Sequence, residues 1–395
     1  MPTTQIAFTY PGQGSQAPAM GAAWTDHPSW ELVQEASTVA GRDIADLLLN
    51  ADAEELRETR NAQLSTFVLS MVVLDAVERL GVEPSLHAGH SLGEYSALVA
   101  SGAVSFADGV RLVTERGNAM QAAAEAVPGT MAAVLGLDDE LVELACVKSN
   151  ADVFVANYNA PGQVVIAGTV EGIEAAGTLA KSLGAKRVMP IKVGGAFHTP
   201  FMAAAGERLA KALADIDFRA PNRPVVANVD AAPHTTEDES RKILSMQLTS
   251  PVRWRQTLHT IEEAGVDLIV ELGAGSVLTG MAKRTIENVA RASVSKPDDL
   301  DALLEEVAHS PKNDRSPDGE HLYASERLVV SPGSGIFTPL DTTMSGRLVG
   351  VGDVIGHVGT TEVRTAFAGE LHGILAMTGE RVASSQPIAW LRVVV

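Results

Sequence analysis

The sequence predicts an α/β protein whose main sheet is mostly parallel, with a small mixed unit inserted into it and an all-β segment at the C-terminal end. Three observations support this prediction. Short apolar runs alternate with long helical patterns ahead of Pro297, the pattern changes between residues 129 and 193, and the helical period disappears after Leu328. Short buried strands that alternate with helices are typical of a parallel sheet covered on both faces.

The main sheet is expected to contain four short apolar strands separated by helices. Because parallel strands bring their carboxyl ends to one edge of a sheet, the loops that follow them are expected to meet there. The strands are predicted at residues 6–10, 86–89, 224–229 and 267–272, and the longest helices at 64–81 and 106–126.

The inserted segment, residues 129–193, has the order βαββαβ, which is typical of a small ferredoxin-like unit. Its six elements follow one another with short connections. The strands are predicted at residues 130–137, 152–159, 162–168 and 185–193, and the helices at 138–149 and 170–184.

The end of the chain is expected to form a separate domain. A last helix is predicted at 298–310, and the polar residues of 309–321, rich in charge, Pro and Gly, predict a linker between residues 1–308 and 322–395. Two stretches beyond the linker, 346–359 and 369–391, resemble each other. Each gives a Gly, an apolar strand and then Gly-Asp or Gly-Glu, so we expect a small β-barrel of two similar halves.

Composition narrows the classes of partner and compartment. The formal charge of −19 over 395 residues disfavours binding to nucleic acid or to anionic membranes, since both attract basic surfaces. The chain start has no basic segment followed by an apolar stretch, and no apolar run reaches the roughly 20 residues of a membrane helix. The single cysteine, Cys146, can form no internal disulfide, so we expect a buried thiol in a cytoplasmic protein.

The sequence GHSLG, residues 89–93, places Ser91 between two glycines after a predicted strand and before a helical pattern. In the G-x-S-x-G motif this arrangement allows a sharp strand-to-helix turn that exposes the serine hydroxyl at the edge of the sheet. The alternative is that Ser91 only caps the helix. The flanking strand and helix favour a nucleophile, with the amide of Leu92 directed from the helix N-terminus at an oxyanion.

A second Gly-rich loop, YPGQGSQ at residues 10–16, follows the first predicted strand and can approach a ligand closely. It lacks the Gly-Lys-Ser/Thr of a phosphate-binding loop, and a plain Pro-Gly turn is the remaining alternative. We interpret it as a second oxyanion-binding loop.

A serine nucleophile needs a base, and the chain has ten histidines. His198 is favoured because it lies in a Gly-rich loop, GAFHTP, where the inserted segment rejoins the main domain ahead of a Thr-Pro helix start. His90, beside the nucleophile, is expected to point away from it. Arg116 stays open between two interpretations: a surface partner of Glu115, or a clamp for a substrate carboxylate.

Seven motifs occur in the order that malonyl-CoA:acyl carrier protein transacylases have, and the chain resembles that family over roughly residues 5–290. The resemblance implies an α/β-hydrolase-like domain with a ferredoxin-like insertion, here residues 1–308. The motifs are YPGQGSQ, GHSLGEYSALVASG, RGNAMQ, GTMAAVLGL, VANYNAPGQVVIAG, GAFHTPFM and QLTSPVRW with ELGAGSVLTGM.

The resemblance also implies roles for residues at the matching positions. Ser91 would be the nucleophile and His198 the general base. Further roles would fall on the backbone amides of Gln13 and Leu92 as the oxyanion hole, on Arg116 as the carboxylate clamp, on the main-chain carbonyl of Gln247 as the group that orients the histidine, and on Phe197 as the side chain that narrows the pocket against methylmalonyl groups.

The activity that the resemblance implies is malonyl transfer from malonyl-CoA to the phosphopantetheine thiol of an acyl carrier protein, in fatty-acid or polyketide synthesis. No metal or redox cofactor is expected. The alternative is an acyl-CoA thioester hydrolase, in which water is the acceptor. An acidic carrier would need a basic docking surface, and the candidates are Lys181, Lys186, Arg187, Lys192, Lys283 and Arg284, although they also fit a solvated helix end.

The tail, residues 322–395, resembles the biotinyl/lipoyl, or barrel-sandwich, domains. Carriers of that family bear a modified lysine at a hairpin tip. Here the hairpin reads GTTEVRTAFAG, and no lysine follows Lys312, so the tail is expected to be unmodified. We interpret it as a docking or oligomerisation module, with a carboxylase or synthase as partner, or as a stabilising appendage.

Overall fold

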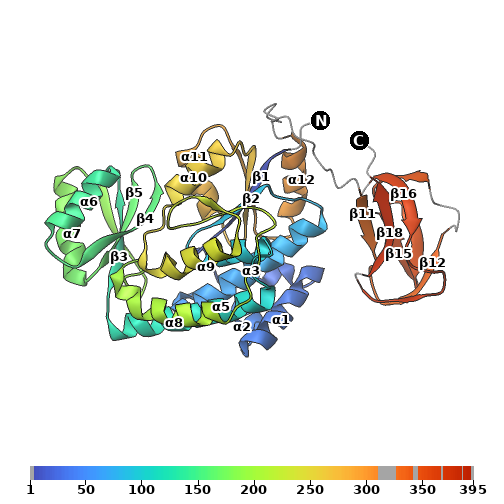
Figure 1. Cartoon of the computed structure of the whole chain (residues 1–395), viewed down its shortest axis with the longest axis horizontal. Helices are drawn as coiled ribbons and strands as arrows, with labels where there is room; N and C mark the ends of the chain where they lie inside the picture. The colour runs from blue at the N-terminus through green and yellow to red at the C-terminus, as the bar shows by residue number, and fades with distance from the viewer. Residues whose placement is uncertain (1–3, 310–325, 341–345, 366–367, 385, 393–395) are drawn as a thin grey trace. The chain divides into compact units, whose positions relative to one another are not determined.

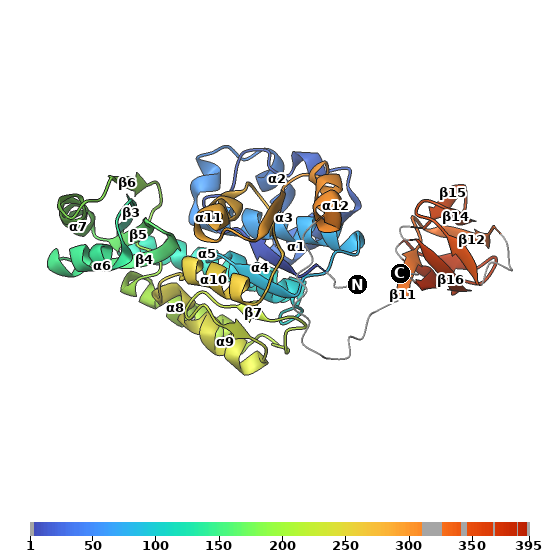
Figure 2. The same ribbon diagram turned by 90° about the horizontal axis from the view of Figure 1, so that it is seen from above.

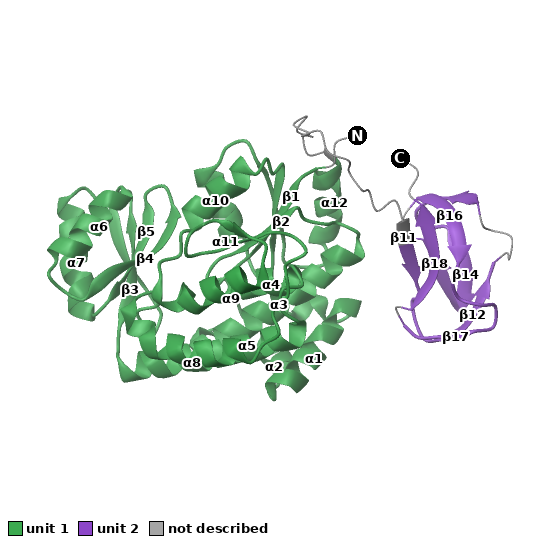
Figure 3. Cartoon of the chain, in the orientation of Figure 1, with its two compact units in different colours: residues 1–315 green, residues 316–395 purple. Residues whose placement is uncertain are grey.

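A computed structural model describes residues 4–309, 326–340, 346–365, 368–384 and 386–392 of the chain. The chain forms two compact units, residues 1–315 and 316–395 (Figure 3). The division between them falls inside the stretch 309–321, which is polar in sequence. Within the described residues, no helix combines the length and the apolar character needed to span a membrane.

The first unit is built on a six-stranded sheet in the order β10-β9-β1-β2-β7-β8. The pairs that join β10, β9, β1, β2 and β7 are parallel, and only β8 runs antiparallel to its neighbour. The predicted mostly parallel sheet is therefore confirmed. The strands are β1 (Ile6–Tyr10), β2 (Leu86–Gly89), β7 (Val225–Val226), β8 (Pro233–His234), β9 (Leu268–Leu272) and β10 (Ala290–Val294).

The strand predicted over residues 224–229 is wrong in its extent, because β7 covers only Val225–Val226. The chain turns back directly after it, since the amide of Ala227 donates to the carbonyl of Ala232 at 3.1 Å. The next amide, that of Asn228, donates to a side chain instead of continuing the sheet.

Helices cover both faces of the sheet (Figures 1 and 2). Alternate residues of β1 enter two cores: Phe8 packs with α3, α4 and α5, while Ala7 packs with α10 and α11. The helices of the first unit outside the insertion are α1 (Glu31–Ala40), α2 (Ile44–Leu49), α3 (Thr59–Arg79), α4 (Gly93–Ala100), α5 (Phe106–Ala126), α8 (Ala203–Ala214), α9 (Glu237–Met246), α10 (Trp254–Glu263), α11 (Val277–Thr285) and α12 (Asp299–His309). Short 3-10 turns lie at Ala22–Trp24, Pro28–Trp30, Glu55–Arg57, Pro200–Met202 and Gln247–Thr249.

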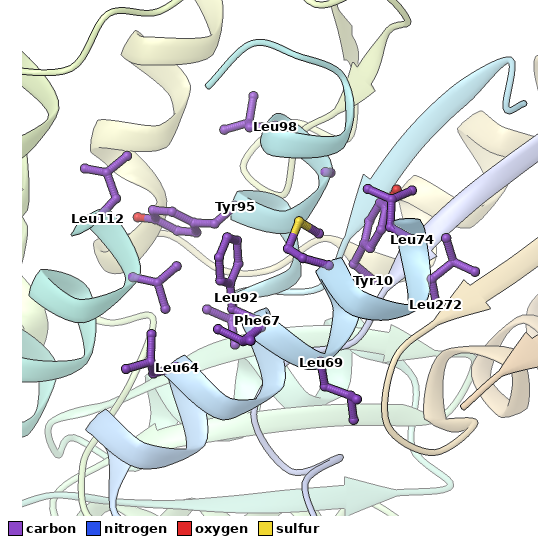
Figure 4. Close-up of a cluster of buried hydrophobic side chains, with 14 of the residues drawn as sticks. Tyr10, Leu64, Phe67, Leu69, Leu74, Leu92, Tyr95, Leu98, Leu112 and Leu272 are labelled. Carbon is purple, nitrogen blue, oxygen red and sulfur yellow. The ribbon is translucent and has the colours of Figure 1, made fainter. Parts of the chain in front are cut away.

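The larger core holds the helix that follows GHSLG in place. Leu64 and Phe67 of α3 gather with Leu92 and Tyr95, at the start of α4, in one buried cluster (Figure 4). Burying side chains of this size contributes about 1.5–3 kcal/mol each to folding. The packing of α3 against the start of α4 therefore holds the turn that carries Ser91 in place.

The inserted unit is a four-stranded antiparallel sheet in the order β4-β5-β3-β6, with its own core against two helices. Its element order matches the predicted βαββαβ pattern. The elements are β3 (Thr130–Leu135), α6 (Asp139–Lys148), β4 (Val153–Ala160), β5 (Gln163–Gly168), α7 (Val170–Ser182) and β6 (Arg187–Ile191).

The second unit consists of two four-stranded sheets, β11-β18-β16-β13 and β15-β14-β12-β17, whose paired strands are antiparallel. A single apolar core that includes Phe337 and Ile355 is formed within this unit. The all-β prediction is confirmed for its described residues. The strands are β11 (Glu326–Val330), β12 (Gly335–Pro339), β13 (Arg347–Val349), β14 (Val354–Val358), β15 (Thr361–Arg364), β16 (Gly369–Ile374), β17 (Arg381–Val382) and β18 (Pro387–Arg392).

Candidate active site

Ser91 lies at the apex of a tight turn between β2 and α4, with a φ of 53°, in the left-handed region. The turn depends on glycine, because a Cβ on Gly93 would lie 2.0 Å from the carbonyl oxygen of Tyr10 and one on Gly89 would lie 1.9 Å from the backbone of Gly93. The helix-cap interpretation is not supported, since the residue that precedes α4 is Leu92. A strained serine at such a turn is typical of a nucleophile elbow.

The side chain of Ser91 contacts the imidazole of His198, with 2.7 Å between Oγ and Nε2. The other ring nitrogen, Nδ1, lies 3.0 Å from the carbonyl oxygen of Gln247 and 3.2 Å from that of Ser250. Carbonyl oxygens only accept hydrogen bonds, so Nδ1 carries the proton and Nε2 is left to accept the serine proton. The predicted pairing of a backbone carbonyl with His198 is what the structure shows.

Burial, and after it the positive charge of Arg116, lower the pKa of His198 far below its ordinary value, to about 3. The imidazole is therefore neutral at physiological pH, which is the form that can take a proton from Ser91. As the pH falls from the ordinary 6.5 of an unfolded histidine towards about 3, the unfolded chain binds a proton that the folded chain does not, so this group lowers stability in acid.

We expect the maximal rate of serine acylation to show no loss assignable to His198 between about pH 5 and pH 8, because a base with so low a pKa stays deprotonated there. Rapid-quench measurement of acyl-enzyme formation across this range, with folding checked by circular dichroism at each pH, tests the expectation. An acid limb with a midpoint near the ordinary histidine value, in fully folded enzyme, would contradict it.

Arg116, on α5, is fully buried. Its Nη2 donates to Ser91 Oγ at 3.0 Å and to Gln247 Oε1 at 3.1 Å, and its Nη1 donates to Gln63 Oε1. Among the described residues, Nε of Arg116 has no hydrogen-bond partner. The surface interpretation of this arginine is therefore wrong. Its sequence neighbour Glu115 is paired with Arg208 instead.

The loop between β1 and the first helical turn lies against the elbow. A Cβ on Gly12 would approach the carbonyl oxygen of His90 to 2.5 Å, so only glycine permits this contact. Gln13 lines the same cavity as Ser91, and its Oε1 accepts a hydrogen bond from Gln63 Nε2 at 3.2 Å. The loop that follows β1 thus lies against the turn that follows β2, and Gln13 and Ser91 line one cavity.

A cavity of about 190 Å³ opens between the main sheet and the inserted unit. Its polar end holds Ser91 and His198, and its apolar lining comes from both parts of the first unit: Met120, Met131, Val165, Phe197, Leu278 and Met281. Phe197 is thus one of the residues that line the cavity. His90 also lines the cavity, but its ring is directed at the inserted unit, in agreement with the prediction that it points away from Ser91. Its Nε2 is 2.9 Å from Asn159 Oδ1, so it is held by the inserted unit and not by the nucleophile.

Three residues that the sequence reasoning missed complete the polar network. Asn228 Oδ1 accepts a hydrogen bond from the Ser91 amide at 2.6 Å, Glu94 Oε2 accepts one from Gln247 Nε2 at 2.8 Å, and Gln63 accepts from Arg116. Asn228 follows a strand at the same sheet edge as Ser91, and this position was a usable indication. Gln63 had no such indication, because the same half of α3 also carries the polar residues Asn61 and Ser65.

A serine hydroxyl paired with a neutral imidazole, at the apex of a glycine elbow, defines the class of enzymes that form acyl-serine intermediates. Residues 7–300 match the model of the acyl transferase domain family. The malonyl CoA-acyl carrier protein transacylase of Escherichia coli K12 is 41% identical in a match 309 residues long, which covers 76% of this chain and 99% of that protein.

Solved structures agree with this relationship. An acyl carrier protein S-malonyltransferase from Vibrio cholerae has a TM-score of 0.73 at 39% identity, covering 76% of this chain and all (100%) of that one. A malonyl-transacylase solved in complex with a type II polyketide synthase acyl carrier protein has a TM-score of 0.74 at 40% identity, covering 77% of this chain and 100% of that one. The chain belongs to the acyl transferase domain family, among its malonyl-CoA:acyl carrier protein transacylases.

Proposed function

We propose that this protein transfers the malonyl group of malonyl-CoA to the phosphopantetheine thiol of an acyl carrier protein, in fatty-acid or polyketide synthesis. The position of Arg116 carries the proposal, because a buried guanidinium 3.0 Å from the Ser91 hydroxyl is a receptor for an acyl group that bears a carboxylate. The name of the Escherichia coli relative supports it. A hydrolase of neutral thioesters, the alternative, has no use for this arginine.

In the first half-reaction, Ser91 Oγ attacks the thioester carbon of malonyl-CoA while His198 Nε2 takes the hydroxyl proton. The tetrahedral oxyanion accepts hydrogen bonds from the amides of Gln13 and Leu92. As the intermediate collapses, the C–S bond breaks, His198 returns the proton to the departing CoA thiolate, and a malonyl ester remains on Ser91. Gln247 stabilises the protonated imidazole through its carbonyl oxygen.

In the second half-reaction, His198 removes the proton from the phosphopantetheine thiol, whose sulfur attacks the malonyl ester, and Ser91 leaves with that proton. CoA departs before the carrier binds, so the kinetics are ping-pong. A thioester is exchanged for a thioester with no change in oxidation state. The proposed reaction therefore uses the chain's own groups and needs no metal or redox cofactor.

Phe197 is proposed to favour malonyl over methylmalonyl groups. It lines the cavity directly before His198 in sequence and is 5% exposed, so its ring occupies space beside the acylated serine. An added methyl branch in a filled apolar site costs about 1–3 kcal/mol. This selectivity concerns the acyl group only. Recognition of the carrier protein is proposed to depend on a separate docking surface.

The proposed docking surface for the carrier is a basic rim, defined as Lys181, Lys186, Arg187, Lys192, Lys283 and Arg284, all exposed. Two contacts support a common location for Arg284 and Arg187 within the rim. Arg284 Nη2 donates to Gln163 Oε1 at 2.7 Å, and Gln163 and Arg187 pair with Leu135 from opposite sides. Residues of α11, which carries Lys283 and Arg284, also line the cavity. On a protein with a net charge of −19, we propose that an acidic carrier docks on these basic residues.

Reversing two charges of the basic rim, Lys186→Glu with Arg187→Glu, is expected to slow malonyl transfer from preloaded enzyme to the carrier about tenfold at low salt. The difference from wild type should shrink as ionic strength rises. Stopped transfer reactions followed by mass spectrometry measure this rate. Arg219→Glu, at an exposed arginine outside the rim, is the matched control. An unchanged rate with unchanged salt dependence would remove the basic rim from the docking proposal.

We also propose that the second unit is a barrel-sandwich domain of the biotinyl/lipoyl type that carries no prosthetic group and docks a carboxylase or synthase. Two antiparallel sheets around one core support the fold, and the absence of lysine after Lys312 in the sequence supports the lack of modification. The hairpin GTTEVRTAFAG includes residues 366–367, which lie outside the described residues. Leu348, Val351 and Met377 are exposed apolar side chains that a partner could cover.

Deletion of residues 316–395 tests this role. The first unit should still load and transfer malonyl groups, because 76% of this chain already covers 99% of the Escherichia coli relative. Oligomeric state by light scattering and binding of a purified carboxylase or synthase should change. If neither changes, the unit is a stabilising appendage and the docking proposal is wrong.

Intact-protein mass spectrometry tests the main proposal directly. The full chain is mixed with malonyl-CoA, separated from it, and then given a holo acyl carrier protein. We expect a malonyl adduct on the enzyme that moves to the carrier. Loss of the adduct to water with the carrier unchanged would support the hydrolase instead.

A further inference from the structure

A buried carboxyl group adjoins the site, and no step of the proposed reaction uses it. Glu94, on the first turn of α4, is 2% exposed. Its Oε2 accepts a hydrogen bond from Gln247 Nε2 at 2.8 Å and another from the Asn228 amide at 3.1 Å. A buried acid costs several kcal/mol to ionise unless hydrogen bonds and charge compensate it, so its presence here calls for a function.

The side-chain amide of Gln247 lies between this acid and the buried arginine. Its Oε1 accepts from Arg116 Nη2 at 3.1 Å, while its Nε2 donates to Glu94 and to the Ser91 carbonyl oxygen, 2.8 Å away. The Arg116 guanidinium therefore binds the oxygen of this amide, and the Glu94 carboxyl group binds its nitrogen. The amide lies between the two groups. A direct ion pair would occupy guanidinium N–H groups that the substrate carboxylate needs.

The chemistry of the carboxylate fixes which way this amide faces. An ionised carboxylate only accepts hydrogen bonds, so Glu94 requires the NH₂ end of Gln247 and turns its oxygen towards Arg116. In the flipped amide, NH₂ would face the guanidinium and oxygen would face both Glu94 and a carbonyl oxygen. Three hydrogen bonds would be lost together, and Arg116 would be displaced from Ser91.

We propose that Glu94 is a positioning residue that selects acyl groups bearing a carboxylate: by fixing the Gln247 amide, it holds the Arg116 guanidinium beside Ser91 as a carboxylate receptor. The same Oε2 also binds the amide of Asn228, whose Oδ1 accepts from the Ser91 amide at 2.6 Å. One acid thus anchors both the serine turn and the receptor. The inference rests on the proposed malonyl transfer.

The test is Glu94→Gln in the full chain, which keeps the shape of the side chain but lets either end of the amide face Gln247. Assays near pH 8 keep wild-type Glu94 mostly ionised, since burial raises its pKa to about 7. For malonyl-CoA we expect kcat/KM for loading to fall about 10- to 100-fold, mainly through KM, as for a lost hydrogen bond to a charged group. Loading from acetyl-CoA should fall much less, because only the contact that reaches Ser91 through Asn228 serves both acyl groups. Glu125→Gln, at an exposed acid on α5, is the matched control.

A double-mutant cycle separates positioning from a general structural role. In an Arg116→Ala background, Glu94→Gln should cause a much smaller further loss with malonyl-CoA than in the wild type, because the proposed selection of the carboxylate runs through the arginine. Where Glu94→Gln does not fold, Glu94→Asp replaces it in the cycle, with the same non-additivity expected. Additive losses, or a malonyl KM that is unchanged or lower in Glu94→Gln, overturn the proposal. A wild-type enzyme that accepts no malonyl group fails the proposed function itself, which is a distinguishable result.

Discussion

Replacing Ser91 by alanine is expected to abolish the malonyl adduct and to reduce transfer to the carrier by at least about 10⁴-fold, because no other group then forms the covalent intermediate. Ser91 Oγ lies 2.7 Å from His198 Nε2 and 3.0 Å from Arg116 Nη2. Intact-protein mass spectrometry after mixing with malonyl-CoA detects the adduct, and peptide mapping places it. Ser182→Ala, at an exposed serine at the end of α7, is the control and should load normally.

The result that would contradict this prediction is an adduct of the same mass on Ser91→Ala. Such an adduct would place the acyl group on another nucleophile. Cys146 is a poor candidate for it, since burial raises the pKa of its thiol to about 12 and leaves the thiol protonated. Equal thermal stability of the variant and the wild type shows that a lost adduct reflects chemistry and not unfolding.

The sequence predicted the parts of the site that follow directly from strand order. Ser91 follows β2, and the YPGQG loop follows β1, so a parallel sheet brings both to one edge. Glycine at positions 12, 89 and 93 also had an unambiguous meaning, because each permits a backbone contact that a Cβ would block. Local pattern and tertiary structure agree at these positions, and the turn could be predicted without coordinates.

The supporting residues could not be predicted in the same way. Gln63 lies on α3, Glu94 on α4 and Asn228 in the turn after β7. Their role depends on hydrogen bonds to partners as far as 153 positions away in the chain. Composition treats a buried glutamine and an exposed one alike, so nothing local marks Gln63. The strand expected at residues 224–229 was overestimated for a related reason: the amide of Asn228 bonds Glu94 and not a neighbouring strand.

Arg116→Ala is expected to reverse the preference of the enzyme between malonyl and acetyl groups. The guanidinium can give a malonyl carboxylate two charge-assisted hydrogen bonds, worth about 3–4 kcal/mol together, so kcat/KM for malonyl-CoA should fall about 10²- to 10³-fold. An acetyl group makes neither bond, and removing a buried positive charge from its pocket should leave its loading within about tenfold of wild type. Parallel loading assays with the two thioesters measure the ratio.

The matched control for Arg116→Ala is Arg111→Ala, an exposed arginine on the same helix that pairs with Asp108. It should leave both rates unchanged, since exposed ion pairs contribute about 1 kcal/mol or less. Equal losses for malonyl- and acetyl-CoA in Arg116→Ala would show that the arginine acts on Ser91 alone and does not bind the carboxylate. The proposed selectivity would then have to come from the cavity lining, where Phe197 and Met120 would be the next residues to change.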